Sequence, residues 1–251
     1  MHTEKNTLKQ ANPPEIKAAM LIIGDEILSG RTQDKNLAWL SDYLGKLGIQ
    51  MAEVRVVPDV HEKIVSAVNE LRRAYDYVFT TGGIGPTPDD ITAEAIAAAF
   101  DLPYQFHPDA KKILEHFYGD QINEARLRMA KMPRGAKLID NPVSHAPGFY
   151  VENVFVMAGV PKIMQAMAMN LDGVLARGAV RHQISFTTPL REGVISETLA
   201  AAMKEFPDVS FGSYPRFLDG GGTEVTLVLR GYDETALQTA QKWVLEKFSA
   251  L

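Results

Sequence analysis

A cluster of glycines at the end of an apolar strand constrains this chain more than any other feature. The run YVFT at residues 77–80 has the composition of a buried strand, and TGGIG follows at residues 81–85. Glycines let backbone N–H groups come close to a ligand. The next segment, TPDDITAE at residues 87–94, has the residues of an acidic helix start, and a helix N-terminus favours a bound anion. The sequence therefore predicts a ligand-binding turn between a strand and a helix.

The acidic residues after the glycines indicate a metal as well. Asp89 and Asp90 place negative charge where a phosphate would bind. A divalent cation removes this conflict, because carboxylates and phosphate oxygens can share one Mg²⁺. A purely structural interpretation stays open, since Thr87 is a good N-cap, Pro88 suits the first helical position and Asp90 completes a capping box. No lysine follows the glycines, so this is not a Walker loop.

The first half of the chain alternates strand and helix patterns. Strands are expected at residues 18–23, 54–57 and 77–80, and helices at residues 36–47, 61–74 and 91–100. This β-α-β-α-β-α order predicts a parallel sheet with helices on both faces. Ligands of such sheets bind outside the carboxyl ends of the strands, where both Gly24-Asp25-Glu26 and residues 81–90 fall.

The second half predicts an insertion and then a smaller unit. In the insertion and after it, helices are expected at residues 107–118 and 122–132, strands at 138–139 and 151–157, and a methionine-rich helix from Pro161. In the smaller unit, strands are expected at 183–188, 209–214 and 224–229, and helices at 193–205 and 233–248. A glycine turn is expected at 220–222, between the last two strands. The predicted organisation is a disordered lead-in at residues 1–15, an α/β domain at 16–176 and a small α+β domain at 177–251.

Composition excludes several function classes. The net charge is −5 and the pI is about 5.7, so the chain lacks the basic footprint of a nucleic-acid or anionic-membrane partner. There is no cysteine, which excludes disulfides, thiolate metal sites and a cysteine nucleophile. No apolar run has the length of a membrane span. These features favour a cytoplasmic protein that acts on a small molecule.

Four segments together resemble a known family. They are TTGGIGPTPDDITAE at 80–94, IGDEILSG at 23–30 with Asn36, Asn141-Pro142 with APGF at 146–149, and GVP at 159–161. They resemble the signature of the molybdopterin-binding (molybdenum cofactor biosynthesis) domain family. The form is most similar to the CinA (competence/damage-inducible protein) branch and to the pterin-binding-like domain fused to eukaryotic FAD synthases. The resemblance covers residues 17–175. It implies a three-layer, doubly wound, mostly parallel sheet, a small KH-like domain after it, and a homo-oligomer.

The resemblance also implies the site residues. It implies catalytic roles for Asp90, Asp25 and Glu26, and it implies that Asp90 and Asp25 are ligands of a Mg, Mn or Co ion. Substrate-binding roles fall to Thr81, Gly82, Gly83, Gly85, Thr87, Asp89, Glu94, Ser29, Gly30, Asn36, Pro147 and Gly148. Asp90 and Glu94 are four residues apart, so one helix turn would point both at the strand ends. His145 lies in a loop that the family uses near substrate, with a surface histidine of no role as the alternative. Asp59 is expected to cap the next helix.

The resemblance implies a metal-dependent nucleotide pyrophosphatase acting on ADP-ribose or FAD. Ile84 replaces the Thr common in adenylyltransferase members, and Ala158 replaces the Pro usual before Gly159-Val160-Pro161. Both departures weaken the case for adenylyl transfer to molybdopterin. Adenylyl transfer and a non-catalytic pterin- or nucleotide-binding module remain the alternatives. RNA binding by the C-terminal unit is disfavoured, because the unit has no basic GxxG loop.

Overall fold

The parallel strands expected from the sequence form the centre of a six-stranded sheet. The computed structural model describes residues 15–218 and 222–251. The strand order is β2-β1-β3-β8-β7-β6. Its parallel members are β1 (Ile16–Ile23), β2 (Ile49–Val57), β3 (Tyr77–Thr81) and β8 (Val154–Met157), and β7 (Gly148–Val151) and β6 (Lys137–Ile139) extend it antiparallel. The α/β class and the mostly parallel sheet are therefore confirmed.

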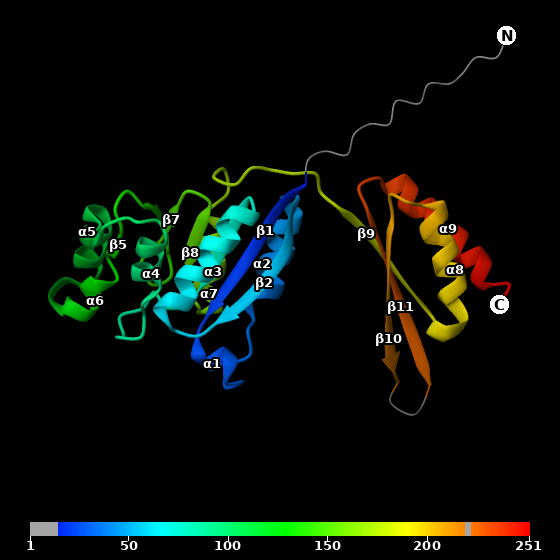
Figure 1. Cartoon of the computed structure of the whole chain (residues 1–251), viewed down its shortest axis with the longest axis horizontal. Coiled ribbons are helices and arrows are strands. Elements are labelled where there is room, and N and C mark those ends of the chain that lie inside the picture. Colours follow the sequence, from blue (N-terminus) through cyan, green and yellow to red (C-terminus); the bar gives the residue numbers. More distant parts are fainter. Residues whose placement is uncertain (1–14, 219–221) are drawn as a thin grey trace, which may run out of the picture. The chain divides into compact units, whose positions relative to one another are not determined.

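Helices cover both faces of this sheet, as Figure 1 shows. Alternate residues of β1 enter two separate cores. One core contains Ala18, Met20 and Ile22 with α2 (Asn36–Lys46) and α7 (Pro161–Met169). The other core contains the intervening residues of β1 and the apolar faces of α3 (His61–Ala74), α4 (Thr92–Ala99) and α5 (Pro108–Tyr118). A strand that is buried on both faces has the continuous apolar sequence seen in β1.

An insertion between α4 and β6 differs from its prediction. The second predicted helix is only α6 (Glu124–Arg128), preceded by the short η1 (Gly119–Gln121). Lys131–Pro133 is instead β5, which pairs antiparallel with β4 (Tyr104–Phe106). The strand predicted at residues 151–157 is in fact part of the β7–β8 hairpin, which turns at Glu152 with a φ of +49°. Both errors come from pairing between strands, which a local sequence pattern does not encode.

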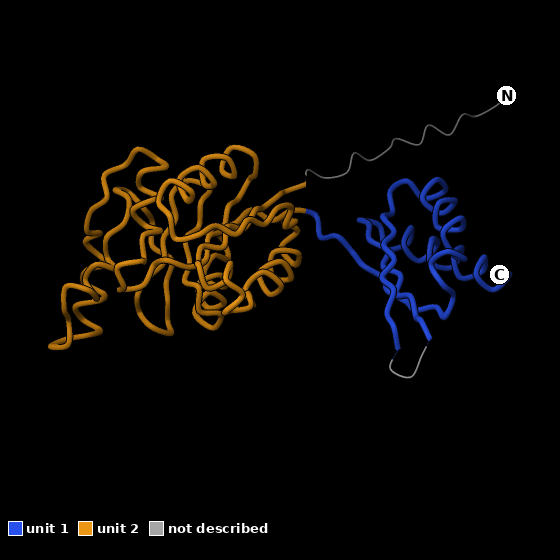
Figure 2. Tube along the Cα trace, turned by 60° about the horizontal axis from the view of Figure 1, so that its bottom comes forward, with its two compact units in different colours: residues 1–14, 179–251 blue, residues 15–178 orange. Residues whose placement is uncertain are grey.

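The remainder of the chain forms a second compact unit, Ala179–Leu251, distinct from Glu15–Gly178 (Figure 2). Its elements are β9 (His182–Thr188), α8 (Glu192–Glu205), β10 (Ser210–Phe217), β11 (Thr223–Gly231) and α9 (Glu234–Phe248). The strands form an antiparallel sheet in the order β10-β11-β9. One side of it packs on α8 and α9 through Ile195, Leu227 and Val244, which are fully buried.

Two predictions lie wholly or partly outside the described residues. Of the disordered lead-in predicted at residues 1–15, only Glu15 is among the described residues. Of the glycine turn predicted at residues 220–222, Gly220 and Gly221 lie outside them. Within residues 15–218 and 222–251, no helix is long and apolar enough to span a membrane.

Candidate functional site

The loop after β3 lies against the neighbouring strands through contacts that only glycine permits. The Gly82 N–H donates to the Met157 carbonyl of β8 at 3.3 Å. A Cβ on Gly82 would collide with the Ile23 carbonyl oxygen of β1, and the Gly82 φ of +102° is one that L side chains rarely adopt. A Cβ on Gly83 would collide with the hydroxyl of Thr92. The loop is therefore fixed over the carboxyl ends of three parallel strands.

Three consecutive backbone N–H groups in this loop are free to bind a ligand. In the part of the chain that the structure describes, the N–H groups of Gly83, Ile84 and Gly85 have no hydrogen-bond acceptor. Successive unpaired N–H groups are typical of anion-binding loops. The glycine loop, residues 82–85, is therefore suited to hold a phosphate group.

Asp90 lies beside this loop, in a turn that precedes α4. Its Oδ2 accepts the Thr87 N–H at 2.8 Å and the Thr87 hydroxyl at 2.5 Å. A Cβ on Gly85 would lie 2.7 Å from the same oxygen. The purely structural interpretation, in which Thr87 is the N-cap of the helix, is therefore wrong, whereas the helix predicted at residues 91–100 corresponds to α4 (Thr92–Ala99). The α4 helix begins at Thr92, because the Thr92 N–H donates to the Gly83 carbonyl and its hydroxyl donates to the Gly82 carbonyl, each at 3.0 Å.

A cleft of about 630 Å³ opens at the glycine loop, within the usual range for a small-molecule site. Its walls come from the segments after β1, β3 and β8, from the insertion and from the loop before β7. The lining residues are Glu26, Thr32, Gly82, Gly83, Ile84, Gly85, Pro86, Asp90, Tyr118, Arg126, Met129, Asn141, Ser144, Ala146, Ala158, Gly159, Val160, Pro161 and Ile163. The expected convergence of strand ends thus produces a real cavity.

Of the three acidic residues predicted for catalysis, Glu26 and Asp90 line the cleft and Asp25 does not. Asp25 is exposed at the start of α1 (Asp25–Leu28), and its N–H donates to the Asp59 carboxylate at 3.0 Å. Asp59 therefore does not cap α3, whose N-cap is Val60 without a side-chain bond. Partial burial raises the pKa of the Asp59 carboxyl, the hydrogen bond from Asp25 opposes this, and the nearby carboxylates add to the rise.

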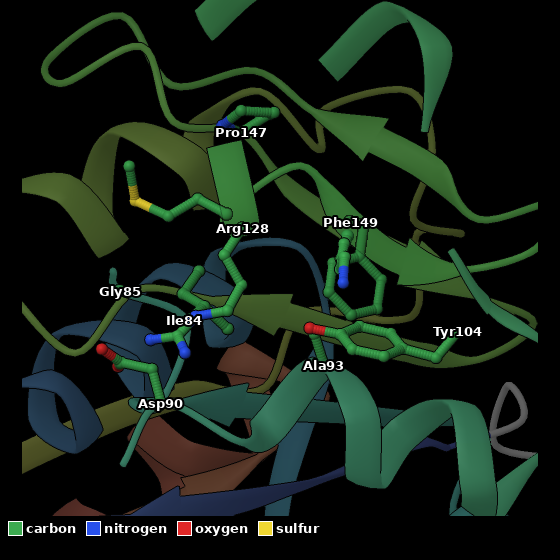
Figure 3. A pocket seen from close by; sticks show the side chains of 11 residues that line it. Ile84, Gly85, Asp90, Ala93, Tyr104, Arg128, Pro147 and Phe149 are labelled. Carbon is green, nitrogen blue, oxygen red and sulfur yellow. The ribbon is translucent and has the colours of Figure 1, made fainter. Parts of the chain in front are cut away.

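Two arginines at this site were not found from the sequence. Arg126 lines the cleft, and Arg128 lines a hollow beside Asp90. Figure 3 shows the Arg128 side chain extending toward Asp90 and Ile84. The Arg128 Nη2 donates to the Pro86 carbonyl at 2.8 Å, and its buried Nε has no acceptor among the described residues. The run EARLR at 124–128, in an otherwise acidic chain, was the available signal.

Three other predicted residues lie in side pockets. Asn36 and Thr81 line a pocket of about 70 Å³ that shares Glu26 and Gly82 with the cleft. The Asn36 amide donates to the Gly159 carbonyl at 2.8 Å. Pro147 lines the hollow of Figure 3.

The other predicted site residues are not brought to the cleft. Besides Asp25 and the three residues of the side pockets, the predicted residues that do not line it are Ser29, Gly30, Thr87, Asp89, Glu94 and Gly148. Glu94 and Asp90 do not share a helix turn, because Asp90 precedes the helix. Glu94 instead contributes, after burial, to a raised pKa of Tyr104.

The loop before β7 is organised by Asn141, which is 2% exposed. Its amide donates to the Ser144 hydroxyl at 2.6 Å and to the Ala146 carbonyl at 2.7 Å. Its Oδ1 accepts the N–H groups of Val143 and Ser144, each at 3.1 Å. His145 has a φ of +61°, packs on the Phe117 ring at 4.2 Å and does not line the cleft.

Comparison with known proteins gives two matches to family models and several relatives. A model described as a probable molybdopterin binding domain matches residues 19–176, and one described as the middle domain of FAD synthase matches residues 181–251. A protein from Pyrobaculum calidifontis is 35% identical over 214 residues, which cover 80% of this chain and 82% of that protein. A CinA-like protein from Citrifermentans bemidjiense is 34% identical over 94% of this chain and 59% of its own length. The crystal structure of a CinA protein of unknown function from Thermoplasma acidophilum is 34% identical, with a TM-score of 0.60 over 63% of this chain and 96% of that chain.

Proposed function

Since this chain belongs to the molybdopterin-binding domain family, in its CinA-like branch, we propose that it is a metal-dependent pyrophosphatase of nucleotides such as ADP-ribose or FAD. The reaction is hydrolysis of the diphosphate bond. Water adds to one phosphorus, the bridging oxygen leaves with the other, and AMP and a second monophosphate are the products. The match of residues 181–251 to the middle domain of FAD synthase supports FAD as one candidate substrate.

One observation carries this proposal: free backbone N–H groups and a carboxylate meet at the same loop. The N–H groups of Gly83, Ile84 and Gly85 suit an anion, whereas Asp90 beside Gly85 repels one. A divalent cation between the carboxylate and the substrate would reconcile the two. A diphosphate carried into the cleft with its metal therefore matches both groups.

The donor set fits a cation that arrives partly coordinated by substrate. Among the residues that the structure describes, no three histidine or acidic side chains form a ready metal cluster. Asp90 and Glu26, which line the same cleft, would hold the ion. Mg²⁺ is commonly held by one or two carboxylates together with substrate phosphates. When bound, such an ion polarises a phosphoryl oxygen and activates water.

The chain's own groups would orient the diphosphate and offset its charge. The free N–H groups of the glycine loop are fixed in advance by the contacts of Gly82 and Gly83, so they need no rearrangement to stabilise developing charge. Arg128 adds a guanidinium that extends toward Asp90 (Figure 3). Its bond to the Pro86 carbonyl holds it against the glycine loop.

The test is AMP release from ADP-ribose and from FAD, with Mg²⁺, Mn²⁺ and Co²⁺, by wild type and by Asp90→Asn. Asparagine keeps an oxygen that can accept from Thr87, so the turn is expected to survive the substitution. We expect kcat/KM to fall by at least about 100-fold, since weaker perturbations of the groups around a metal already cost 10–100-fold. Asp42→Asn, an exposed carboxylate on α2, is the charge-matched control. Undiminished metal-dependent turnover by Asp90→Asn would refute the assignment.

Adenylyl transfer to molybdopterin is a second candidate, favoured by the description of the matched family. It uses the same cleft but needs ATP and a pterin acceptor. Adenylylated molybdopterin formed from ATP and Mg²⁺, with no hydrolysis of ADP-ribose or FAD, would select it over the pyrophosphatase.

A further inference from the structure

The insertion places an aromatic ring and an arginine side by side in the wall of the cleft. Tyr118 ends α5 and Arg126 belongs to α6, and both line the 630 Å³ cavity. The Arg126 guanidinium carbon lies 4.4 Å from the centre of the Tyr118 ring. Neither residue has a part in the proposed handling of the diphosphate.

Both side chains are held in place by contacts outside the cleft. The Arg126 Nη1 donates to the Gln121 carbonyl of η1. The Phe117 ring packs against Tyr118 with its plane at 71° and its centre 4.9 Å away. The Asn123 side chain accepts the Arg126 N–H at 2.9 Å and so caps α6. Arg126 is therefore oriented before any ligand binds.

The surroundings of this pair are suited to a flat ring. A guanidinium is planar and stacks on π-systems, and Tyr118 covers one side of it. Met129, Ile84 and Ile163 add apolar surface to the same cleft. Free anion-binding groups are already present in the glycine loop, so a phosphate does not require Arg126.

We propose that Tyr118 and Arg126 form a stacking subsite for the planar base of the nucleotide substrate, while the glycine loop holds its phosphates. This inference rests on the proposed nucleotide substrate. It assigns the choice of base to the insertion and the chemistry to the strand ends. Unpaired bases of single-stranded nucleic acids stack on aromatic rings and on arginine guanidinium planes in the proteins that bind them, and the base of a free nucleotide offers the same flat surface.

The test measures binding rather than turnover, so it is independent of whether the protein hydrolyses anything. AMP and ribose 5-phosphate share the ribose and the phosphate and differ in the base. Isothermal titration calorimetry on the full chain would give both dissociation constants. We expect AMP to bind wild type about tenfold or more tightly than ribose 5-phosphate, which corresponds to one stacked base.

Variants at the two positions separate stacking from charge. Arg126→Lys keeps the charge but loses the plane, and Tyr118→Leu removes the ring. Each is expected to weaken AMP binding about tenfold and to leave ribose 5-phosphate within about twofold. Tyr118→Phe is expected to retain AMP binding, because the ring remains. Arg134→Lys, at an exposed arginine after β5, is the matched control.

Two results would overturn the inference. Equal binding of AMP and ribose 5-phosphate to wild type would show that no base is recognised. Equal weakening of both ligands in Arg126→Lys, in a variant whose thermal unfolding matches wild type, would show that Arg126 binds the phosphate instead. Absence of hydrolysis together with the expected AMP preference would refute the pyrophosphatase and leave the stacking subsite standing.

Discussion

Replacing Gly82 with alanine tests whether the glycine loop is fixed by backbone contact. Two separate costs are expected at this position. The φ of +102° is disfavoured for any residue with a Cβ, which costs about 1–2 kcal/mol. The new Cβ would also lie closer than 3.0 Å to the Ile23 carbonyl oxygen, which belongs to β1, a strand paired on both sides. Forced overpacking of this kind costs typically about 1–3 kcal/mol.

The sum predicts that Gly82→Ala lowers the free energy of unfolding by about 2–5 kcal/mol. Gly135→Ala is the matched control, because its φ is +82° and nothing lies within 4 Å of its Cβ position. It isolates the conformational cost, so we expect a loss of about 1–2 kcal/mol there. In Gly159→Ala, the new Cβ would lie 3.3 Å from the Cα of Gly82, and Gly159 has no positive φ. We therefore expect its free energy of unfolding to lie between those of wild type and Gly82→Ala.

Urea unfolding followed by circular dichroism gives these differences from shifts in the midpoint at unchanged slope. A chain with two compact units can unfold in more than one transition, so a spectroscopic probe in each unit follows the unfolding of that unit. A loss for Gly82→Ala no larger than that for Gly135→Ala would refute the reasoning, since it would mean that the contact with Ile23 adds nothing.

Two further predictions concern stability away from the glycine loop. Hydrogen bonds from Tyr75 and Arg55 lower the pKa of Glu53 below its ordinary value of 4.5. The stabilisation from ionised Glu53 is therefore complete above pH 4.5 and is lost as the pH falls through the lowered pKa. Glu53→Gln should lower the Tm at neutral pH and approach wild type in acid, and a Tm difference independent of pH would contradict this. Asn141→Ala removes four hydrogen bonds from a buried position, so the unfolding free energy should fall by about 2–4 kcal/mol, measured in urea. A loss below about 1 kcal/mol would show that Ser144 and its loop hold their conformation without Asn141.

Local patterns were sufficient to predict the parallel half of the sheet. The helix at 61–74 has the predicted ends, because apolar residues recur at helical spacing and an apolar strand follows directly. The strand before the glycine loop was found from a continuous apolar run, as expected for a strand buried on both faces. The rule that ligands bind beyond strand ends points to residues 81–90, and the cleft is lined there by residues 82–86 and Asp90.

The remainder depends on contacts between distant parts of the chain. Thr87 has the residue type of an N-cap, but it does not cap α4, because bonds from Thr92 to the glycine loop set the start of that helix at Thr92. Asp25 follows a strand end like Glu26, yet the path of α1 and the bond to Asp59 leave it outside the cleft. Tyr118 and Arg126 reach the cleft only because the insertion folds back onto it, which no spacing in the sequence shows.

The most direct test of the proposed pyrophosphatase is product analysis of ADP-ribose hydrolysis in ¹⁸O-labelled water, with Mg²⁺, Mn²⁺ or Co²⁺. The proposal predicts AMP and ribose 5-phosphate in equal amounts, one ¹⁸O atom in one of the two monophosphates, and loss of both products in EDTA. Production of no AMP with any of the three metals, from protein that still binds AMP, would contradict it.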